Sequence, residues 1–220
     1  MPKINIAIDG PASSGKTTIS NLLAQKLKYQ FLDSGLLYRH FAWFCQKNND
    51  SFSISREQLD SRLLFDWQKT ILTDKKKMLL QLENERAKLT SPAISILTSQ
   101  LSPRPELRQI VFNFQRELTK NKGYVVCGRD ITFKVLPEAE VKIFLDASLE
   151  ARAKRRQIQL QKAKILLSFA EVEKDLKERD QRDQANISKA KASGLKIDTT
   201  NLKETEVVKK IYELLKNRFL

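Results

Sequence analysis

The chain has 220 residues, of which 41% are hydrophobic and 30% charged, a balance that suits a folded domain with a substantial buried core. No apolar run approaches the roughly 18 residues of a membrane-spanning helix, and a strand pattern starts almost at the N-terminus, so we expect neither a membrane segment nor a signal peptide. Two distant cysteines, Cys45 and Cys127, and a single histidine argue against zinc sites, disulfides and secretion, and favour a cytoplasmic protein.

The net charge is +14 and the isoelectric point is about 9.8. Such an excess of basic groups suits either nucleic acid or a polyanionic small molecule. The lysines are scattered through predicted helices, and the sequence lacks a basic stripe interleaved with aromatic residues. We therefore expect a small anionic ligand, and neither nucleic acid nor a membrane as the main partner.

The N-terminal segment combines a strand, a glycine loop and a helix. Residues 3–8 alternate apolar and other side chains, as a half-buried strand does. The loop reads Gly10-Pro11-Ala12-Ser13-Ser14-Gly15-Lys16-Thr17 and fits the phosphate-binding pattern G-x-x-x-x-G-K-[ST]. Apolar residues then recur at helical spacing, at Ile19, Leu22, Leu23 and Leu27. This order predicts an anion site formed by loop amides, the helix N-terminus and Lys16.

Four further strands are predicted, each followed at once by polar residues. They are residues 31–32 before Asp33-Ser34-Gly35, residues 124–126 before Gly128-Arg129-Asp130, residues 141–145 before Asp146-Ala147-Ser148, and residues 195–197 before Asp198-Thr199-Thr200. A last helix follows, with Val207, Val208, Ile211, Leu214 and Leu215 on one face. The alternation predicts an α/β fold with a five-stranded parallel sheet, whose ligands bind at the carboxyl ends of the strands.

Two stretches interrupt this alternation. In the first, about residues 40–119, residues 63–82 favour a small antiparallel hairpin around Thr73-Asp74-Lys75. Helices are predicted after it, one opening at Pro92 and one over residues 105–119. In the second, about residues 152–183, residues 151–164 carry six basic side chains and no acid, and a mixed-charge helix follows. Two charged helices with a hinge between them suit a mobile flap over a site.

These motifs together resemble the bacterial cytidylate (CMP) kinases, nucleoside monophosphate kinases of the adenylate-kinase-like P-loop class. The motifs that carry the resemblance are the loop at residues 10–17, Asp33-Ser34-Gly35-Leu36-Leu37-Tyr38-Arg39, Ser99 with Pro105 and Arg108, Gly128-Arg129-Asp130, Val141-Lys142-Ile143-Phe144-Leu145-Asp146-Ala147-Ser148, and Lys177-Glu178-Arg179-Asp180 with Asp183. The resemblance implies a P-loop NTPase core (residues 1–39, 120–151 and 184–220), a nucleotide-monophosphate-binding insertion with a small antiparallel sheet (40–119) and a helical lid (152–183).

The resemblance also implies roles for particular residues. ATP would be bound by Gly10, Pro11, Ala12, Ser13, Ser14, Gly15, Lys16, Thr17 and Thr18, with Lys16 at the outer phosphates and Thr17 at Mg²⁺. Arg39 and Arg129 would grip the α-phosphate of the acceptor, because guanidinium groups match phosphate oxygens. Arg155 and Arg156 would close over the transferring group. The implied catalytic set is thus Lys16, Arg129, Arg155 and Arg156.

The remaining implied roles concern recognition of the acceptor. Ser34 would lie near its sugar, and Asp183 with Arg179 would hold the ribose hydroxyls. Ser99, Arg108 and Asp130 would read the cytosine edge, where a carboxylate plus a donor can distinguish cytosine from uracil. The implied reaction is ATP-dependent phosphorylation of CMP, and of dCMP, to the diphosphate. It needs positioning and charge neutralisation but no general base, and the enzyme is expected to be a monomer.

The chain departs from the family pattern at several positions. Thr132 and Phe133 follow Gly128-Arg129-Asp130 where the family usually has Gly-Thr, which could reshape the acceptor pocket. Asn186 and Thr90 each stand where the family usually has an arginine, and the interior of the loop reads Ala-Ser-Ser. These departures are compatible with an altered or slow enzyme.

Simpler interpretations of the same residues stay open. Asp33 and Ser34 could cap a helix, Arg129 and Asp130 could form an ordinary ion pair, and the basic residues of 151–164 could be a solvated helix face. At the level of function, the alternatives are a small-molecule P-loop kinase with another acceptor, or a nucleotide- or nucleic-acid-binding protein without transfer activity.

Overall fold

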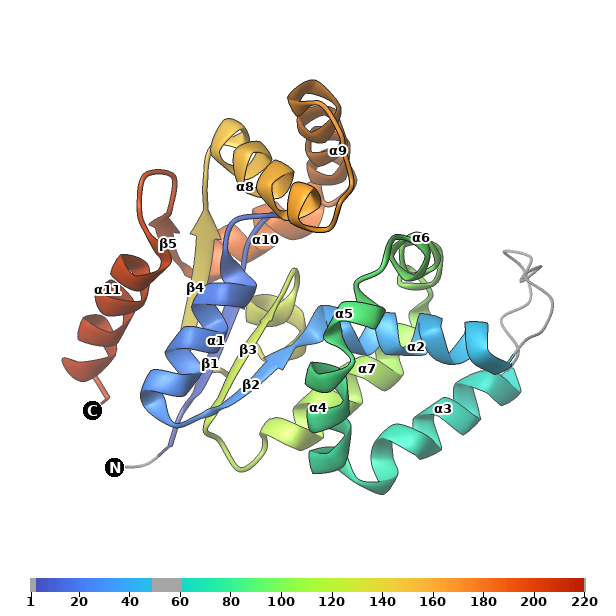
Figure 1. Ribbon diagram of the computed structural model, residues 1–220. Coiled ribbons are helices and arrows are strands. Elements are labelled where there is room, and N and C mark those ends of the chain that lie inside the picture. Colours follow the sequence, from blue (N-terminus) through green and yellow to red (C-terminus); the bar gives the residue numbers. More distant parts are fainter. Residues whose placement is uncertain (1–2, 49–60, 220) are drawn as a thin grey trace. The chain divides into compact units, whose positions relative to one another are not determined.

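The computed structural model describes residues 3–48 and 61–219, and the chain divides into two compact units (Figure 1). Unit 1 consists of Met1–Leu32 with Lys122–Leu220, and unit 2 of Asp33–Asn121. No helix in the described ranges is long and apolar enough to cross a membrane.

The five predicted strands are confirmed, with ends that differ from the predicted ones by at most two residues. They are β1 (Asn5–Asp9), β2 (Gln30–Asp33), β3 (Tyr124–Gly128), β4 (Val141–Asp146) and β5 (Leu195–Asp198). The sheet is parallel and has the order β2-β3-β1-β4-β5, so β1 lies at its centre. Asp9, the last residue of β1, is in register with Gly128 of β3 and Phe144 of β4. The polar residues that follow these strands therefore meet at one edge of the sheet.

Helices cover both faces of this sheet. Ile6, Ile8 and Leu145 face one side, where α1 (Lys16–Leu27) and α11 (Glu204–Lys216) complete the main hydrophobic core. Successive strand residues point to opposite faces, so Ala7 and Phe144 face the other side. There the π-helical turn η1 (Ile131–Val135) and α10 (Gln184–Ser193) contact the strands (Figure 1). Neither η1 nor α10 was predicted from the sequence.

The two predicted charged helices are also present in unit 1. They are α8 (Leu149–Lys162), capped by the Ser148 hydroxyl, and α9 (Phe169–Arg182), which starts with a capping box of Ser168 and Glu171. Their facing sides bury a small apolar cluster of Ala153, Val172 and Leu176. The helices are thus confirmed, whereas their movement as a lid, and the predicted boundaries of core, insertion and lid, stay predictions.

After Asp33, the regular secondary structure in the described residues of unit 2 is helical. The helices are α2 (Ser34–Asn48), α3 (Ser61–Thr73), α4 (Lys75–Asn84), α5 (Arg86–Leu89), α6 (Pro92–Leu101) and α7 (Pro105–Thr119). Phe41, Trp67 and Phe114 are the largest buried side chains at the centre of this unit. The predicted helix starts at Pro92 and Pro105 are confirmed, since both prolines occupy first-turn positions where no amide donor is needed.

The hairpin predicted for residues 63–82 is wrong, because this stretch forms α3 and α4. Leu64, Trp67 and Ile71 are buried at helical spacing, whereas Phe65 is 66% exposed. The apparent turn is a helix start: Asp74 Oδ1 accepts a hydrogen bond of 2.9 Å from Lys77 N. Residues 63–82 therefore do not supply the small antiparallel sheet expected in the insertion.

Candidate active site

The loop between β1 and α1 is shaped for close contact with an anion. A Cβ added to Gly10 would lie 2.2 Å from Leu145 O, so only glycine fits there. Gly15 has a φ of 90° and Ser13 a φ of 60°, left-handed conformations that tighten the loop. Lys16 Nζ donates a 2.8 Å bond to Pro11 O across the loop, and the first turn of α1 holds no acidic residue. The helix N-terminus thus keeps its positive end for a phosphate.

The other residues predicted at the ATP site occupy this same loop and helix start. Ser14 is buried, Ala12 and Thr17 are partly buried, and Thr18 is exposed. The Ser14 Oγ atom is buried without a hydrogen-bond partner in the described part of the chain. No group of three or more His, Cys, Asp or Glu residues in the described ranges could hold a metal ion.

Arg155 is bonded to the segment that follows β5. Its guanidinium donates to Thr199 Oγ1 at 3.1 Å and also to the Thr199 and Thr200 carbonyl oxygens. The buried Thr199 Oγ1 lies 3.1 Å from both Ser14 O and Asp146 O. Arg155 is therefore linked to the phosphate-binding loop through one threonine. The predicted contact between Arg155 and the transferring phosphoryl group stays a prediction.

Arg156 and Arg179 come together between α8 and α9. Burial lowers the pKa of Arg156, and the positive charge of Arg179 lowers it further, while Asp175 opposes this shift. Arg179 Nε lies 3.0 Å from Asp175 Oδ2. Two guanidinium groups with one carboxylate between them leave a surplus positive charge, so a bound phosphate anion would relieve their repulsion.

Arg129 and Asp183 form an ion pair that joins the segment after β3 to the start of α10. The sequence offered Arg129 with Asp130 as the simpler alternative, and the structure pairs Arg129 with Asp183 instead. Asp130 is only 5% exposed and lies directly before η1. The three predicted acceptor-binding residues of this region thus lie on segments that follow β3 and α9.

In unit 2, the predicted acceptor-binding residues gather on α2, α6 and α7. Arg39 Nη1 donates to Ser95 Oγ at 2.7 Å and to Leu89 O at 3.3 Å. Ser99, one helical turn after Ser95, donates to Ile96 O. The Arg108 guanidinium lies 5.9 Å from the ring centre of Tyr38. Because α2 packs against both α6 and α7, Arg39, Ser99 and Arg108 belong to one helix cluster.

Ser34 is buried at the start of α2, and Asp33 supports that start. Asp33 Oδ1 accepts a 3.0 Å bond from Gly35 N, and Oδ2 lies 3.1 Å from Arg86 Nη1. The capping interpretation of Asp33 is therefore correct for its carboxylate. The contact of Ser34 with a nucleotide stays a prediction.

The departures from the family pattern lie in different surroundings. The Thr132 side chain is buried and bonded to Asp9, whereas Phe133 is partly buried. Thr90 donates to Arg86 O at 2.8 Å. Asn186 lies in the first turns of α10 and is partly buried.

Sequence reasoning missed three buried polar residues beside the loop: Asp9, Arg152 and Thr199. Arg152, 5% exposed, donates to Ala147 O, Ala12 O and Asp180 Oδ2 at 3.1, 3.3 and 2.6 Å. Asp9 and Thr199 both stand at strand ends, the position that marks ligand sites in such sheets. That signal was present, whereas nothing distinguished Arg152 from its basic neighbours.

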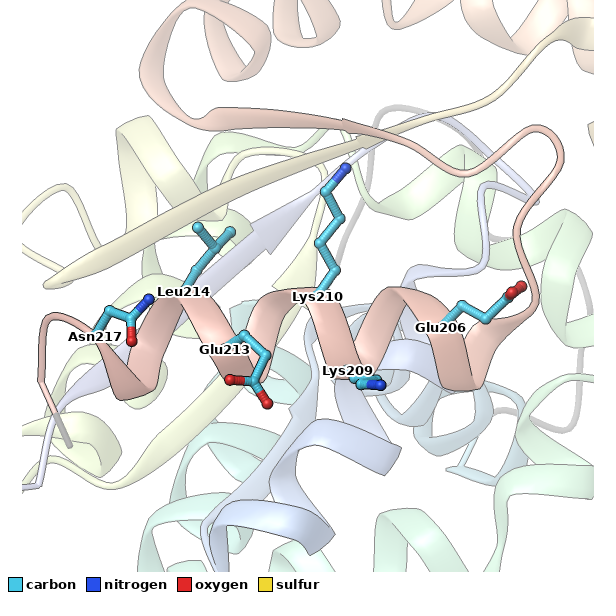
Figure 2. Close-up of a pocket in the computed structure, with 6 residues that line it drawn as sticks. All are labelled: Glu206, Lys209, Lys210, Glu213, Leu214 and Asn217. Atoms are coloured by element: carbon cyan, nitrogen blue, oxygen red, sulfur yellow. The ribbon is translucent and has the colours of Figure 1, made fainter.

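The hollow along α11 contains none of the predicted site residues (Figure 2). Its lining comes from one helix and consists of Glu206, Lys209, Lys210, Glu213, Leu214 and Asn217. The arrangement is an open helix surface.

Comparisons with known proteins agree with this architecture. The cytidylate kinase family model matches residues 6–217. A cytidylate kinase from Mycoplasmopsis synoviae is 40% identical over 219 residues, covering 97% of this chain and 99% of that protein. One from Thermosipho melanesiensis is 41% identical over 219 residues and covers 97% of both chains.

Solved structures support the fold alone. Shikimate kinase from Acinetobacter baumannii, in complex with shikimate, has a TM-score of 0.51 and 19% identity, covering 99% of this chain and 96% of that one. An uncharacterized protein from Eubacterium ventriosum has a TM-score of 0.58 and 13% identity, with 98% and 99% covered. Given the match over residues 6–217 and the relatives at 40–41% identity, the chain belongs to the cytidylate kinase family.

Proposed function

We propose that this protein phosphorylates CMP, and also dCMP, at the expense of ATP, releasing ADP and the cytidine diphosphate. Membership of the cytidylate kinase family makes the chain a phosphotransferase with ATP as co-substrate. The observation that carries the proposal is this match over residues 6–217 together with a loop that only glycine at position 10 can form.

The loop after β1 supplies the phosphate site. Its amides and the α1 N-terminus bind the phosphates of ATP, and Lys16 neutralises their charge once it exchanges Pro11 O for a phosphate oxygen. The Thr17 hydroxyl would hold Mg²⁺, which would supply neutralisation of the phosphate charge. Transfer then depends on in-line positioning, since the acceptor is already an anion.

The arginines of unit 1 bind and enclose the reacting groups. Arg129 binds the acceptor phosphate, and Asp183 with Arg179 binds the ribose hydroxyls. Nucleotide binding therefore separates the Arg129–Asp183 pair. This separation costs little stability, because the Arg129 side chain is 45% exposed and exposed ion pairs stabilise a protein only slightly. Arg155 and Arg156 close over the phosphoryl group and exclude water, which would otherwise hydrolyse ATP.

The helices of unit 2 supply the remaining recognition. We assign phosphate binding to Arg39, sugar contact to Ser34, and reading of the cytosine edge to Ser99 and Arg108 together with Asp130. Arg39 and Arg108 are held in place before substrate arrives, by Ser95 and by the Tyr38 ring. Held side chains lose less conformational entropy on binding.

The test is an ADP-release assay with ATP, Mg²⁺ and one acceptor at a time: CMP, dCMP, UMP, AMP, GMP, dTMP or shikimate, with an acceptor-free control. We expect turnover with CMP and dCMP only. Preference for another acceptor would mean that the protein is a kinase whose substrate is not CMP. Loss of acceptor-dependent turnover in protein that still binds ATP would contradict the proposal. The proposal also includes a cytoplasmic location, which cell fractionation checks, and a monomeric state, which light scattering checks.

A further inference from the structure

Asp9 is a carboxylate at the centre of the sheet, directly before the phosphate-binding loop. It ends β1, its exposure is 0%, and the next residue is Gly10. An ionised carboxylate at such a position is costly unless hydrogen bonds replace the lost water. The partners of Asp9 therefore decide how this junction is held.

Three donors from one short segment meet this carboxylate. Ile131 N donates to Oδ1 at 3.0 Å, and Thr132 N donates to Oδ2 at 2.8 Å. Thr132 Oγ1 adds a third bond to Oδ2 at 2.7 Å. Both residues are fully buried, and they open η1 immediately after Asp130. Amides at a helix start lack partners within the helix, so Asp9 satisfies two of them.

Each hydrogen-bond donor to Asp9 stabilises its ionised form against the effects of burial and of a neighbouring negative charge. Burial raises the pKa of Asp9, the bonds from Thr132 and Ile131 lower it, and the nearby charge of Asp130 raises it again. A charged hydrogen bond lost at such a place leaves a buried, partly unsatisfied carboxylate. Either the Ile131 and Thr132 amides would then shift towards the carboxylate, or the Asp9 side chain would rotate away from them.

We propose that Thr132 is a positioning residue whose hydroxyl, through Asp9, fixes the segment Gly128-Arg129-Asp130 against the junction of β1 and the phosphate-binding loop. All of these residues lie in unit 1. The inference rests on the proposed function, because Arg129 and Asp130 are the residues assigned to the acceptor. Thr132 thus acts on CMP binding through the two residues before η1, without contacting CMP.

The experiment compares Thr132→Val, which keeps the shape and the amide but removes the hydroxyl, with Thr132→Ser, which keeps the hydroxyl. KM for CMP and for ATP is measured separately. We expect Thr132→Val to raise KM for CMP about tenfold with KM for ATP within about twofold, and Thr132→Ser to stay within about twofold for both. If Thr132→Val does not fold, Thr132→Ala carries the same comparison.

A second readout is independent of activity. Hydrogen exchange in the absence of nucleotide should speed up at the amides of Arg129 to Thr132 in the valine variant, and not in the serine variant, while α11 amides keep their relative protection. Equal KM values and equal protection in both variants would overturn the inference. If the unmodified protein fails the acceptor panel, the proposed function falls, and the exchange comparison still decides whether Thr132 holds this segment.

Discussion

The two units place their buried polar groups differently. In unit 1 most of these groups lie at strand ends and around the phosphate-binding loop, at Asp9, Ser14, Asp130, Thr132, Arg152 and Thr199, while Asn5 lies at the start of β1 and Ser20 within α1. In unit 2 they lie within helices, at Ser34, His40, Gln115 and Thr119, and the last two bond to carbonyl oxygens of their own helix. Unit 1 thus uses buried polar bonds to join segments around the phosphate-binding loop. In unit 2 the buried bond between Trp67 and His40 joins α3 to α2, and the bonds of Gln115 and Thr119 stay within α7.

The buried polar bonds of unit 1 preorganise the segments around the phosphate-binding loop. Asp9 and Arg152 are buried charges with three hydrogen bonds each, so the segments that they join are held in one geometry before substrate arrives. Such preorganisation favours transfer, because little reorganisation is left for the reaction itself. Substitutions in unit 1 should therefore separate catalysis from stability, and the buried histidine of unit 2 should act on stability alone.

Replacing Lys16 should have the largest effect. Lys16→Ala removes the charge that we propose meets the outer phosphates, and we expect kcat to fall about 1,000-fold, as for loss of a group that stabilises transition-state charge. The denaturant midpoint of unfolding should stay close to that of the parent, because the amine donates a hydrogen bond to Pro11 O at a partly buried position. Lys16→Arg is the control that keeps the positive charge but replaces the compact ammonium by a planar guanidinium, and its kcat should also fall. Activity near the parent value in Lys16→Ala would remove this loop from the mechanism.

Replacing Asp180 should mainly reduce stability. The side chain of Arg152 is only 6% exposed, so Asp180→Ala would leave a buried guanidinium without its ionic partner. We expect the free energy of unfolding to fall by about 3 kcal/mol in denaturant titrations. Glu178→Ala, an exposed carboxylate on the same helix, is the matched control and should change stability little. Equal effects of the two substitutions would show that the Arg152–Asp180 pair does not hold α9.

The histidine of unit 2 should make stability depend on pH. Burial lowers the pKa of His40 to about 4 from the usual 6.5, with Lys88 adding to the shift, and Nδ1 accepts a 2.9 Å bond from Trp67 Nε1. The unfolded chain binds the proton more readily, so this contribution is present above pH 6.5 and is lost as the pH falls towards 4. The loss amounts to about 3 kcal/mol at most.

The comparison that isolates this effect is His40→Gln, which can still accept from Trp67 but does not titrate. Carboxylates also titrate between pH 4 and 6.5, so only the difference in slope between the parent and this variant reports on His40. Because the chain has a single histidine, no other imidazole contributes. Identical slopes would mean that His40 takes up a proton without cost in the folded protein.

The sequence by itself determined the sheet and the phosphate-binding loop. Strand periodicity, the glycines at positions 10 and 15 and the polar residues at strand ends are local patterns, and all five strands and α1 follow from them. The family resemblance added candidate residues for the acceptor. The same local reasoning failed at residues 63–82, where short apolar runs such as Met78-Leu79-Leu80 fit either a strand or a helix, and the faces that α3 and α4 bury have helical spacing.

Only the tertiary structure decided which polar groups hold the site together. Asp9 and Thr132 are 123 residues apart, and Arg152 and Ala12 are 140 apart, so no spacing in the chain could pair them. Thr132, which the sequence suggested as a side chain near the acceptor pocket, is turned onto a buried carboxylate. The physical reason is that a hydrogen bond between distant segments depends on how the sheet brings strand ends together, whereas a strand, a loop or a helix start depends on neighbouring residues.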